Sequence, residues 1–298
     1  DYILQIPELP RNIAIAGGGV IGVEYASMFA VLGVKVTLIE QKKQLLPFVD
    51  REIIESLQYH MRNLGVTLRL GEEVSSVTKR DDGQVETVLK SGKRVVSEMV
   101  LVSAGRQGAV DKLNLHAVGL DADKYGRIKV NEFGQTAVPN IYAVGDVVGF
   151  PSLASTGMTQ GRKATSHAFG IKDQTLNVPL PYGIYSIPEI SMVGETEDSL
   201  TEKQVPYETG IARYKEIARG QLIGDEIGML KIIFHRETLE LLGVHVIGEG
   251  AAEIVHLGQA LIAMKATINY LTEAVFNYPT LTESYKVAAL DGLNKIRQ

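Results

Sequence analysis

The amino-acid sequence predicts an α/β fold in which parallel strands alternate with helices, and three observations support that prediction. An apolar strand over residues 12–16 runs into a glycine-rich loop and then into a helix-periodic stretch over residues 20–32. A second apolar strand follows over residues 34–39. Residues 99–104 form a further apolar run, which is typical of a buried parallel strand whose carboxyl end faces a ligand crevice.

The loop between the first strand and the first helix has the G-x-G-x-x-G spacing of a dinucleotide-binding turn. Gly17 permits the tight turn, Gly19 lets the backbone approach a pyrophosphate, and Gly22 lets the helix and strand pack closely. The first helical residues, Val20 and Ile21, place the helix N-terminus under the phosphate oxygens. Because strand, loop and helix occur in this order, the sequence predicts a dinucleotide site.

Glu40 ends the second strand at the distance from Gly22 that dinucleotide-binding folds use. Its carboxylate would accept a hydrogen bond from the ribose 2′-hydroxyl of NAD, and it would repel the 2′-phosphate of NADP by about 1–4 kcal/mol. Lys42 and Lys43 stand where they could offset that repulsion, or they could be solvated surface charges. An acid with lysines beside it suits a site that binds both nucleotides.

Composition excludes several other functions. The net charge of -5 offers no basic surface to nucleic acid. No apolar run is long enough for a membrane helix and no signal segment opens the chain, so we expect no membrane partner and a cytoplasmic location. The chain has no cysteine and can therefore supply no disulfide or thiolate. His256 and Glu253 lack a third ligand, so no metal site is expected.

The remaining pattern changes character along the chain. Residues 81–83 are a hairpin turn, residues 172–181 are a polar linker, and the strands and helices after the linker indicate an α+β layer. The other expected elements are helices over residues 50–64, 156–169 and 251–266, and strands over residues 66–70, 74–79, 85–89, 94–96, 141–144, 182–187, 229–235 and 241–247.

Three segments together resemble the flavoprotein disulfide reductase family. They are GGGVIGVE at residues 17–24, SAGR at residues 103–106 and VPNIYAVGD at residues 138–146. The resemblance implies a homodimer and a segment before Asp1 that carries the first half of the FAD site, so we expect these 298 residues to purify colourless and inactive. The implied parts are a connector (1–9), a Rossmann-like NAD(P)-binding nicotinamide domain (10–107), the C-terminal half of a second Rossmann-like, FAD-binding domain (108–174) and an α+β dimerisation domain (175–298).

The same resemblance assigns cofactor-binding residues. The counterpart of Asp146 accepts a hydrogen bond from the FAD ribityl chain, although a turn aspartate is the simpler alternative. Glu24 resembles the family residue near the nicotinamide carboxamide, and Gly105 and Arg106 would line the same crevice; ordinary helix and turn chemistry stays open for all three. The residues placed beside FAD are Gly145, Asp146, Leu153 and Ala154.

The segment FNYPTLTE at residues 276–283 distinguishes among members of the family. Its disulfide reductases carry His-Pro-Thr-x-x-Glu there, whereas this chain has Tyr278, and a phenol is a much poorer base at neutral pH than an imidazole. Hydride transfer between nicotinamide and flavin needs no such base. Tyr278 and Glu283 are the candidate catalytic residues. An interface aromatic and a Thr280-x-x-Glu283 capping box before a helix are the structural alternatives.

This segment and residues 287–294 look like those of the soluble pyridine nucleotide transhydrogenases. That resemblance implies FAD-dependent hydride transfer between NADPH and NAD+, with the two nucleotides binding in turn at one site. Two alternatives remain open. One is a dihydrolipoamide dehydrogenase-like disulfide reductase, and the other is a non-catalytic module that binds nucleotide and dimerises.

Overall fold

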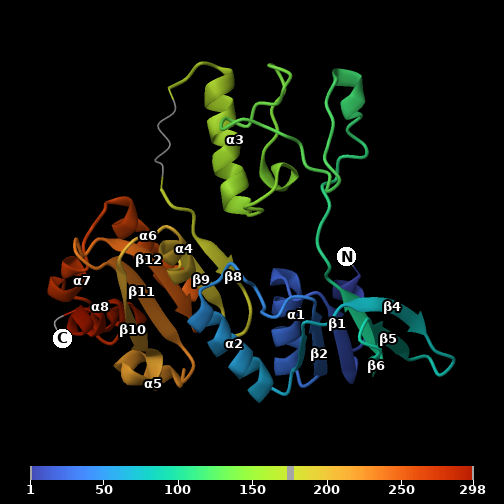
Figure 1. Ribbon diagram of the computed structural model, residues 1–298, viewed down its shortest axis with the longest axis horizontal. Coiled ribbons are helices and arrows are strands. Elements are labelled where there is room, and N and C mark those ends of the chain that lie inside the picture. The colour runs from blue at the N-terminus through green and yellow to red at the C-terminus, as the bar shows by residue number, and fades with distance from the viewer. Residues whose placement is uncertain (1, 173–177, 297–298) are drawn as a thin grey trace. The chain divides into compact units, whose positions relative to one another are not determined.

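The computed structural model describes residues 2–172 and 178–296, and the chain divides into two compact units (Figure 1). Unit 1 comprises residues 1–104 and 178–298, and unit 2 comprises residues 105–177. The expected linker and the expected boundary at 174/175 overlap residues 173–177, which lie outside the described residues.

Unit 1 begins with a four-stranded parallel sheet in the order β3-β2-β1-β7. In this sheet Ile15 of β1 lies between Leu38 of β2 and Leu101 of β7. The strand, loop, helix and second strand predicted over residues 12–40 are confirmed. The elements are β1 (Asn12–Ala16), α1 (Val20–Val31), β2 (Lys35–Glu40), α2 (Arg51–Asn63), β3 (Thr67–Leu70) and β7 (Met99–Val102).

The start and the buried face of α2 both follow from its sequence. Asp50 caps the helix by accepting a hydrogen bond from the backbone N–H of Glu52 at 3.1 Å. Ile53, Leu57 and Met61 recur at helical spacing and are all fully buried. The cap therefore fixes where α2 begins, and the apolar face of the helix packs into the core.

A three-stranded antiparallel sheet, β4-β5-β6, precedes β7 in the chain and confirms the predicted hairpin. β7 is parallel, as predicted, but the prediction that it is buried is wrong, because Val102 is 66% exposed. The strand lies at the edge of its sheet, where only β1 pairs with it among the described residues. The antiparallel strands are β4 (Val74–Lys79), β5 (Val85–Leu89) and β6 (Arg94–Ser97).

The second half of unit 1 is a five-stranded antiparallel sheet with helices, which is the predicted α+β layer. The strand predicted to reach residue 187 ends at Ile184, because the next backbone N–H groups bond to α1. The helix predicted to reach residue 266 ends at Ala263, before Lys265 with its φ of 52°. β9, β10, α4, α5 and α7 were not predicted. In sheet order the strands are β10 (Tyr207–Arg213), β11 (Met229–His235), β12 (Leu241–Ile247), β9 (Ile190–Gly194) and β8 (Tyr182–Ile184). The helices and 3-10 turns are α4 (Glu197–Glu202), η4 (Tyr214–Glu216), α5 (Ala218–Ile223), α6 (Ala251–Ala263), α7 (Asn269–Glu273), η5 (Leu281–Glu283) and α8 (Ser284–Ile296).

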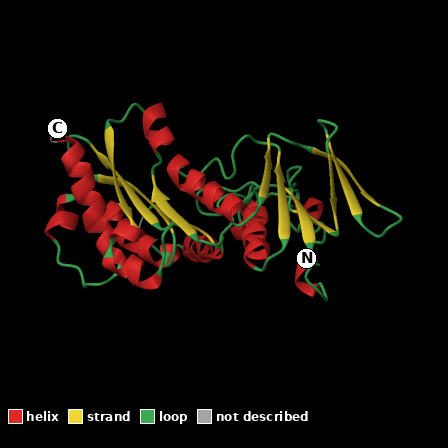
Figure 2. Cartoon of the chain, turned by 90° about the horizontal axis from the view of Figure 1, so that it is seen from below, coloured by secondary structure: helices red, strands yellow, loops and turns green. Residues whose placement is uncertain are grey.

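A shared apolar core joins the two larger sheets of unit 1. It combines Ile15 and Leu57 from the parallel half with Ile190 and Ile247 from the antiparallel half. A second core lies entirely among residues from Val193 onward. In Figure 2 helices lie between the two larger sets of strands. The nicotinamide and dimerisation regions expected from the sequence therefore pack as one unit.

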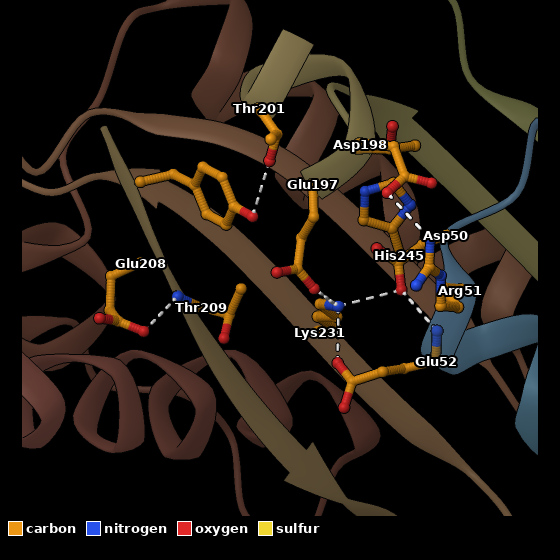
Figure 3. A network of polar contacts seen from close by, with 12 residues as sticks. Asp50, Arg51, Glu52, Glu197, Asp198, Thr201, Glu208, Thr209, Lys231 and His245 are labelled. Atoms are coloured by element: carbon orange, nitrogen blue, oxygen red, sulfur yellow. Dashed lines mark hydrogen bonds and ion pairs between the residues drawn. The ribbon is translucent and has the colours of Figure 1, made fainter. Parts of the chain in front are cut away.

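A buried cation also links the two halves of unit 1 (Figure 3). Lys231, on β11, has no exposed surface, and its ammonium lies 3.0 Å from Asp50 Oδ1 and 2.6 Å from Glu52 Oε2 and also contacts Glu197. The three carboxylates lie close enough together to hold a metal ion, but the ammonium takes that place. Burial lowers the pKa of Lys231, and the carboxylates more than reverse the effect, so the pKa is raised above its usual range. Lys231 is therefore a permanent internal cation.

His245 lies across from Lys231 on β12. It is 1% exposed, and its Nε2, at 2.8 Å from the carbonyl oxygen of Glu195, donates to that oxygen. Its Nδ1 has no hydrogen-bond partner among the described residues. Burial lowers the pKa of His245, and this outweighs the nearby carboxylates, which raise it.

A pH dependence of stability follows from this burial. Below about pH 6.5, His245 binds a proton more readily in the unfolded chain than in the folded one. The free energy of unfolding should therefore fall by up to about 1.4 kcal/mol for each unit by which the pH is lowered. Burial also lowers the pKa of His60, which adds to the same trend. Urea denaturation of the wild type and of His245→Gln between pH 7.5 and 5.5 measures this. The variant should lose less stability on acidification, and parallel curves would refute the assignment.

Unit 2 is built around α3 (Ala154–Ala168), which confirms the predicted helix and begins slightly earlier than expected. The strand predicted over residues 141–144 is wrong, because the structure has only an isolated bridge between Gln135 and Tyr142. The described residues of unit 2 contain no strand that could pair with this segment. None of the described helices is long and apolar enough to cross a bilayer. The short 3-10 turns elsewhere are η1 (Ile3–Gln5), η2 (Leu115–Val118) and η3 (Gly145–Val148).

Candidate nucleotide-binding site

The glycine loop connects β1 to α1 in the way that the sequence pattern predicts. Gly17 has a φ of 111°, and a Cβ built there would lie 2.6 Å from the carbonyl oxygen of Ser103. A Cβ on Gly22 would overlap the carbonyl oxygen of Gly17 and lie 2.7 Å from Ser103 Oγ. Both positions therefore require glycine, the first for the turn and the second for the contact between helix and loop.

Gly19 is different, because its surroundings are open. A Cβ built on it would meet nothing within 4 Å, and Ile21, two residues further along, is 37% exposed. Gly19 is the N-cap of α1 and provides no side-chain cap, so the first backbone N–H groups, from Val20 onward, lack partners within the helix. The structure thus presents a helix N-terminus to a space that an anion can enter.

Glu40 is fixed against this loop by two backbone hydrogen bonds. Its Oε2 accepts from the N–H of Gly18 at 2.6 Å, and its Oε1 accepts from the N–H of Lys42 at 2.8 Å. Each carboxylate oxygen keeps acceptor capacity for a further donor, such as a ribose hydroxyl. The side chains of Lys42 and Lys43 are exposed, so both interpretations of these lysines stay open.

Ser103 is a residue of this site that the sequence reasoning did not single out. Its hydroxyl can donate to the carbonyl oxygen of Gly17 at 2.9 Å or to that of Ala16 at 3.1 Å. Ser103, the residue just after β7, therefore holds the glycine turn in place through these hydrogen bonds. The only sequence signal for it was its position at the start of the SAGR segment.

Glu24 and Ser27, one turn apart on α1, anchor the chain that follows β8. Glu24 Oε1 accepts from the N–H of Tyr185 at 2.8 Å, and Ser27 Oγ accepts from the N–H of Ile187 at 3.0 Å. Glu24 thus has a structural partner, while its expected role at the nicotinamide stays a prediction. Gly105 and Arg106, the residues expected beside it, belong to unit 2 and are described separately.

In unit 2 the structure brings Arg106, Gly145 and Asp146 together. The Arg106 guanidinium lies 3.8 Å from Asp146 Oδ2, in a pair that is more than half exposed on both sides. The N–H of Gly145 donates to Gln160 Oε1 at 2.7 Å. α3 begins at Ala154 without a side-chain cap. An exposed carboxylate near an uncapped helix N-terminus offers an acceptor and donors for hydroxyl and carbonyl groups of a ligand.

Tyr278 and Glu283, the candidate catalytic residues, lie in a segment that lacks the predicted capping box. The capping box predicted for Thr280 and Glu283 is wrong, because the Thr280 hydroxyl donates to the carbonyl oxygen of Asn277 at 2.8 Å. The predicted helix does follow, as α8. Glu283 Oε2 is buried with no hydrogen-bond partner among the described residues. Tyr278 is 72% exposed.

The parallel sheet, glycine loop and anchored acid define a dinucleotide-binding fold, and comparison with known proteins identifies the family. The family profile for pyridine nucleotide-disulphide oxidoreductases matches residues 1–161, and the profile for the dimerisation domain of the same family matches residues 180–289. The chain belongs to this family. The resemblance and the fold class inferred from the sequence are thereby confirmed.

Individual relatives narrow the comparison. The chain is 53% identical over its whole length to the soluble pyridine nucleotide transhydrogenase of Mycobacterium tuberculosis, and 50% identical over 99% of its length to that of Serratia proteamaculans. It spans 63% and 64% of these relatives, respectively.

Solved structures show the same fold. The HOCl-induced flavoprotein disulfide reductase RclA from Escherichia coli aligns with a TM-score of 0.90 at 27% identity, over 97% of this chain and 66% of that one. LpdA from Mycobacterium tuberculosis aligns with a TM-score of 0.88 at 26% identity, over 97% of this chain and 63% of that one.

Proposed function

We propose that this chain serves FAD-dependent hydride transfer between NADPH and NAD+. The observation that carries the nucleotide part is Glu40, whose carboxylate is clamped by Gly18 and Lys42 at the rim of an open glycine loop. The relatives called soluble pyridine nucleotide transhydrogenases, which match along the whole chain, favour this reaction over others of the family.

Within this proposal, residues 10–107 bind the nicotinamide nucleotides. The pyrophosphate lies over Gly19 and the N-terminus of α1, where the structure leaves space. Glu40 accepts from the adenosine ribose of NAD, and its repulsion of the NADP 2′-phosphate is offset by Lys42 and Lys43. Residues 108–174 contribute to the FAD site, and residues 175–298 form the homodimer.

The residues of unit 2 fit part of a flavin site. Asp146 would accept a hydrogen bond from a ribityl hydroxyl, and the backbone N–H groups after Leu153 would donate to polar atoms of the ligand. When bound, FAD would keep the two electrons between the departure of one nucleotide and the arrival of the next. Because the described part of unit 2 contains only isolated bridges and no sheet, we propose that residues 1–298 alone retain no flavin.

The features at Tyr278 favour hydride transfer over thiol chemistry. The phenol is exposed and is a poor base, and this chain supplies no cysteine. The disulfide-reductase alternative would need a thiol pair from outside these 298 residues. The non-catalytic alternative predicts that these 298 residues, as they stand, bind nucleotide and dimerise without turnover.

Steady-state kinetics test the proposal. The full-length gene product, loaded with FAD, is assayed with NADPH and a thio-analogue of NAD+, and both concentrations are varied. We expect parallel lines in double-reciprocal plots, because the two nucleotides use one site in turn. Lipoamide and glutathione disulfide serve as control substrates and should be turned over poorly. Intersecting lines, or brisk reduction of a disulfide, would overturn the proposal.

A further inference from the structure

The segment over residues 41–50, which leads from β2 to α2, is fixed at both ends. At its start, Glu40 bonds to the glycine loop, and a Cβ on Gly18 would lie 2.5 Å from Cδ2 of Leu45. Leu45 is fully buried, so the segment packs directly against the loop that would cradle a pyrophosphate. At its end, Asp50 caps α2 and contacts Lys231.

The contact at the far end reaches into the other half of unit 1. Asp50 is 2% exposed and Lys231 is not exposed at all, and the ammonium also binds Glu52 and Glu197 (Figure 3). The ammonium is thus paired with three carboxylates, and it donates hydrogen bonds to those of Asp50 and Glu197. These carboxylates come from the cap and first turn of α2 and from α4, so the ammonium holds the end of the segment to the antiparallel half.

We propose that Lys231 is a positioning residue for nucleotide binding, acting through Asp50 on the segment that carries Lys42, Lys43 and Leu45. The inference rests on the proposed function, because it assumes that the adenosine half of a nicotinamide nucleotide lies beside this segment. It assigns to the antiparallel half an influence on nucleotide affinity that is exerted through this segment.

The physical reason is the cost of leaving Asp50 unpaired. Without the ammonium, a buried carboxylate must bind a proton or move toward water. Movement of Asp50 displaces the segment that it ends, and Leu45 transmits the displacement to the backbone of Gly18. The segment with Asp50 paired to Lys231 and the segment displaced by its loss are two arrangements, and we expect them to have different affinities for the same nucleotide.

Titration calorimetry of the 298-residue chain with NADH and with ADP-ribose tests the inference, at a temperature where every variant is folded by circular dichroism. Lys231→Met should weaken both ligands about tenfold, the usual size of a coupling between separate sites. Hydrogen exchange over residues 41–50 should be faster in the unliganded variant. Should Lys231→Met fail to fold, Asp50→Asn, which keeps a helix cap, should weaken both ligands about threefold.

Phe234→Leu is the matched control, since Phe234 is fully buried in the second core, which contains no residue of the segment. It should lower the melting temperature and leave both dissociation constants within about twofold of wild type. If the wild type binds neither ligand, the proposed function fails. If the wild type binds both, and Lys231→Met and Asp50→Asn bind them equally well, the positioning role of Lys231 is wrong and the proposed function stands.

Discussion

Gly22→Ala should abolish dinucleotide binding and destabilise unit 1, whereas Gly19→Ala should fold normally and still bind poorly. A methyl group on Gly22 overlaps the carbonyl oxygen of Gly17 and approaches Ser103 Oγ to 2.7 Å. Backbone has to move to relieve that overlap, at a cost of about 1–3 kcal/mol or more. The displaced backbone is the glycine turn itself, so the site and the fold are damaged together.

Gly19 supplies the contrast because the same added methyl group meets no protein atom within 4 Å. Its φ of -72° is open to alanine, but alanine is a poorer N-cap residue than glycine, so the free energy of unfolding should fall by about 1 kcal/mol. The methyl group occupies the space through which a pyrophosphate would approach, and affinity for NADH should fall at least about tenfold.

Urea denaturation and NADH titration of the two variants measure these effects. A stable Gly22→Ala protein with wild-type affinity would contradict the steric reading of the loop. Unchanged affinity in Gly19→Ala would show that the pyrophosphate lies elsewhere, even if the fold is as described.

Local sequence signals were sufficient where neighbouring residues determine the structure. Residues 12–40 were predicted correctly because strand, glycine turn and helix are each specified by nearby spacing. The same reasoning placed Glu40 at the end of β2. It could not show that the carboxylate bonds to Gly18, because that contact depends on how the loop folds back over the sheet.

Predictions failed where partners are distant or compete. The segment 141–144 is apolar enough for a strand, yet strands need neighbours, and the described part of unit 2 provides only a bridge. Thr280 has the spacing of a capping residue, but its hydroxyl donates to the carbonyl oxygen of Asn277 instead of accepting from the helix. No role was predicted for Lys231, because the carboxylates that pair with it lie on elements distant in the sequence.

The charge balance around Lys231 makes its removal the second large effect that we expect. Lys231→Met should lower the free energy of unfolding by about 3–5 kcal/mol, because it leaves carboxylates clustered without their cation and one of them buried. Lys203→Met is the matched control. Lys203 pairs with Glu195 at 2.6 Å but is 55% exposed, so its loss should cost about 1 kcal/mol or less.

A change of sign distinguishes this electrostatic origin from simple loss of packing. In the wild type, Glu197→Gln removes a charged partner of the ammonium and should destabilise the chain by about 1–3 kcal/mol. In the Lys231→Met background the same substitution removes one of the uncompensated negative charges, so it should stabilise the chain. A double-mutant cycle by urea denaturation at pH 7.5 measures both steps. If Glu197→Gln destabilises both backgrounds equally, the carboxylates do not act as partners of Lys231, and the methylene packing of the lysine accounts for its contribution.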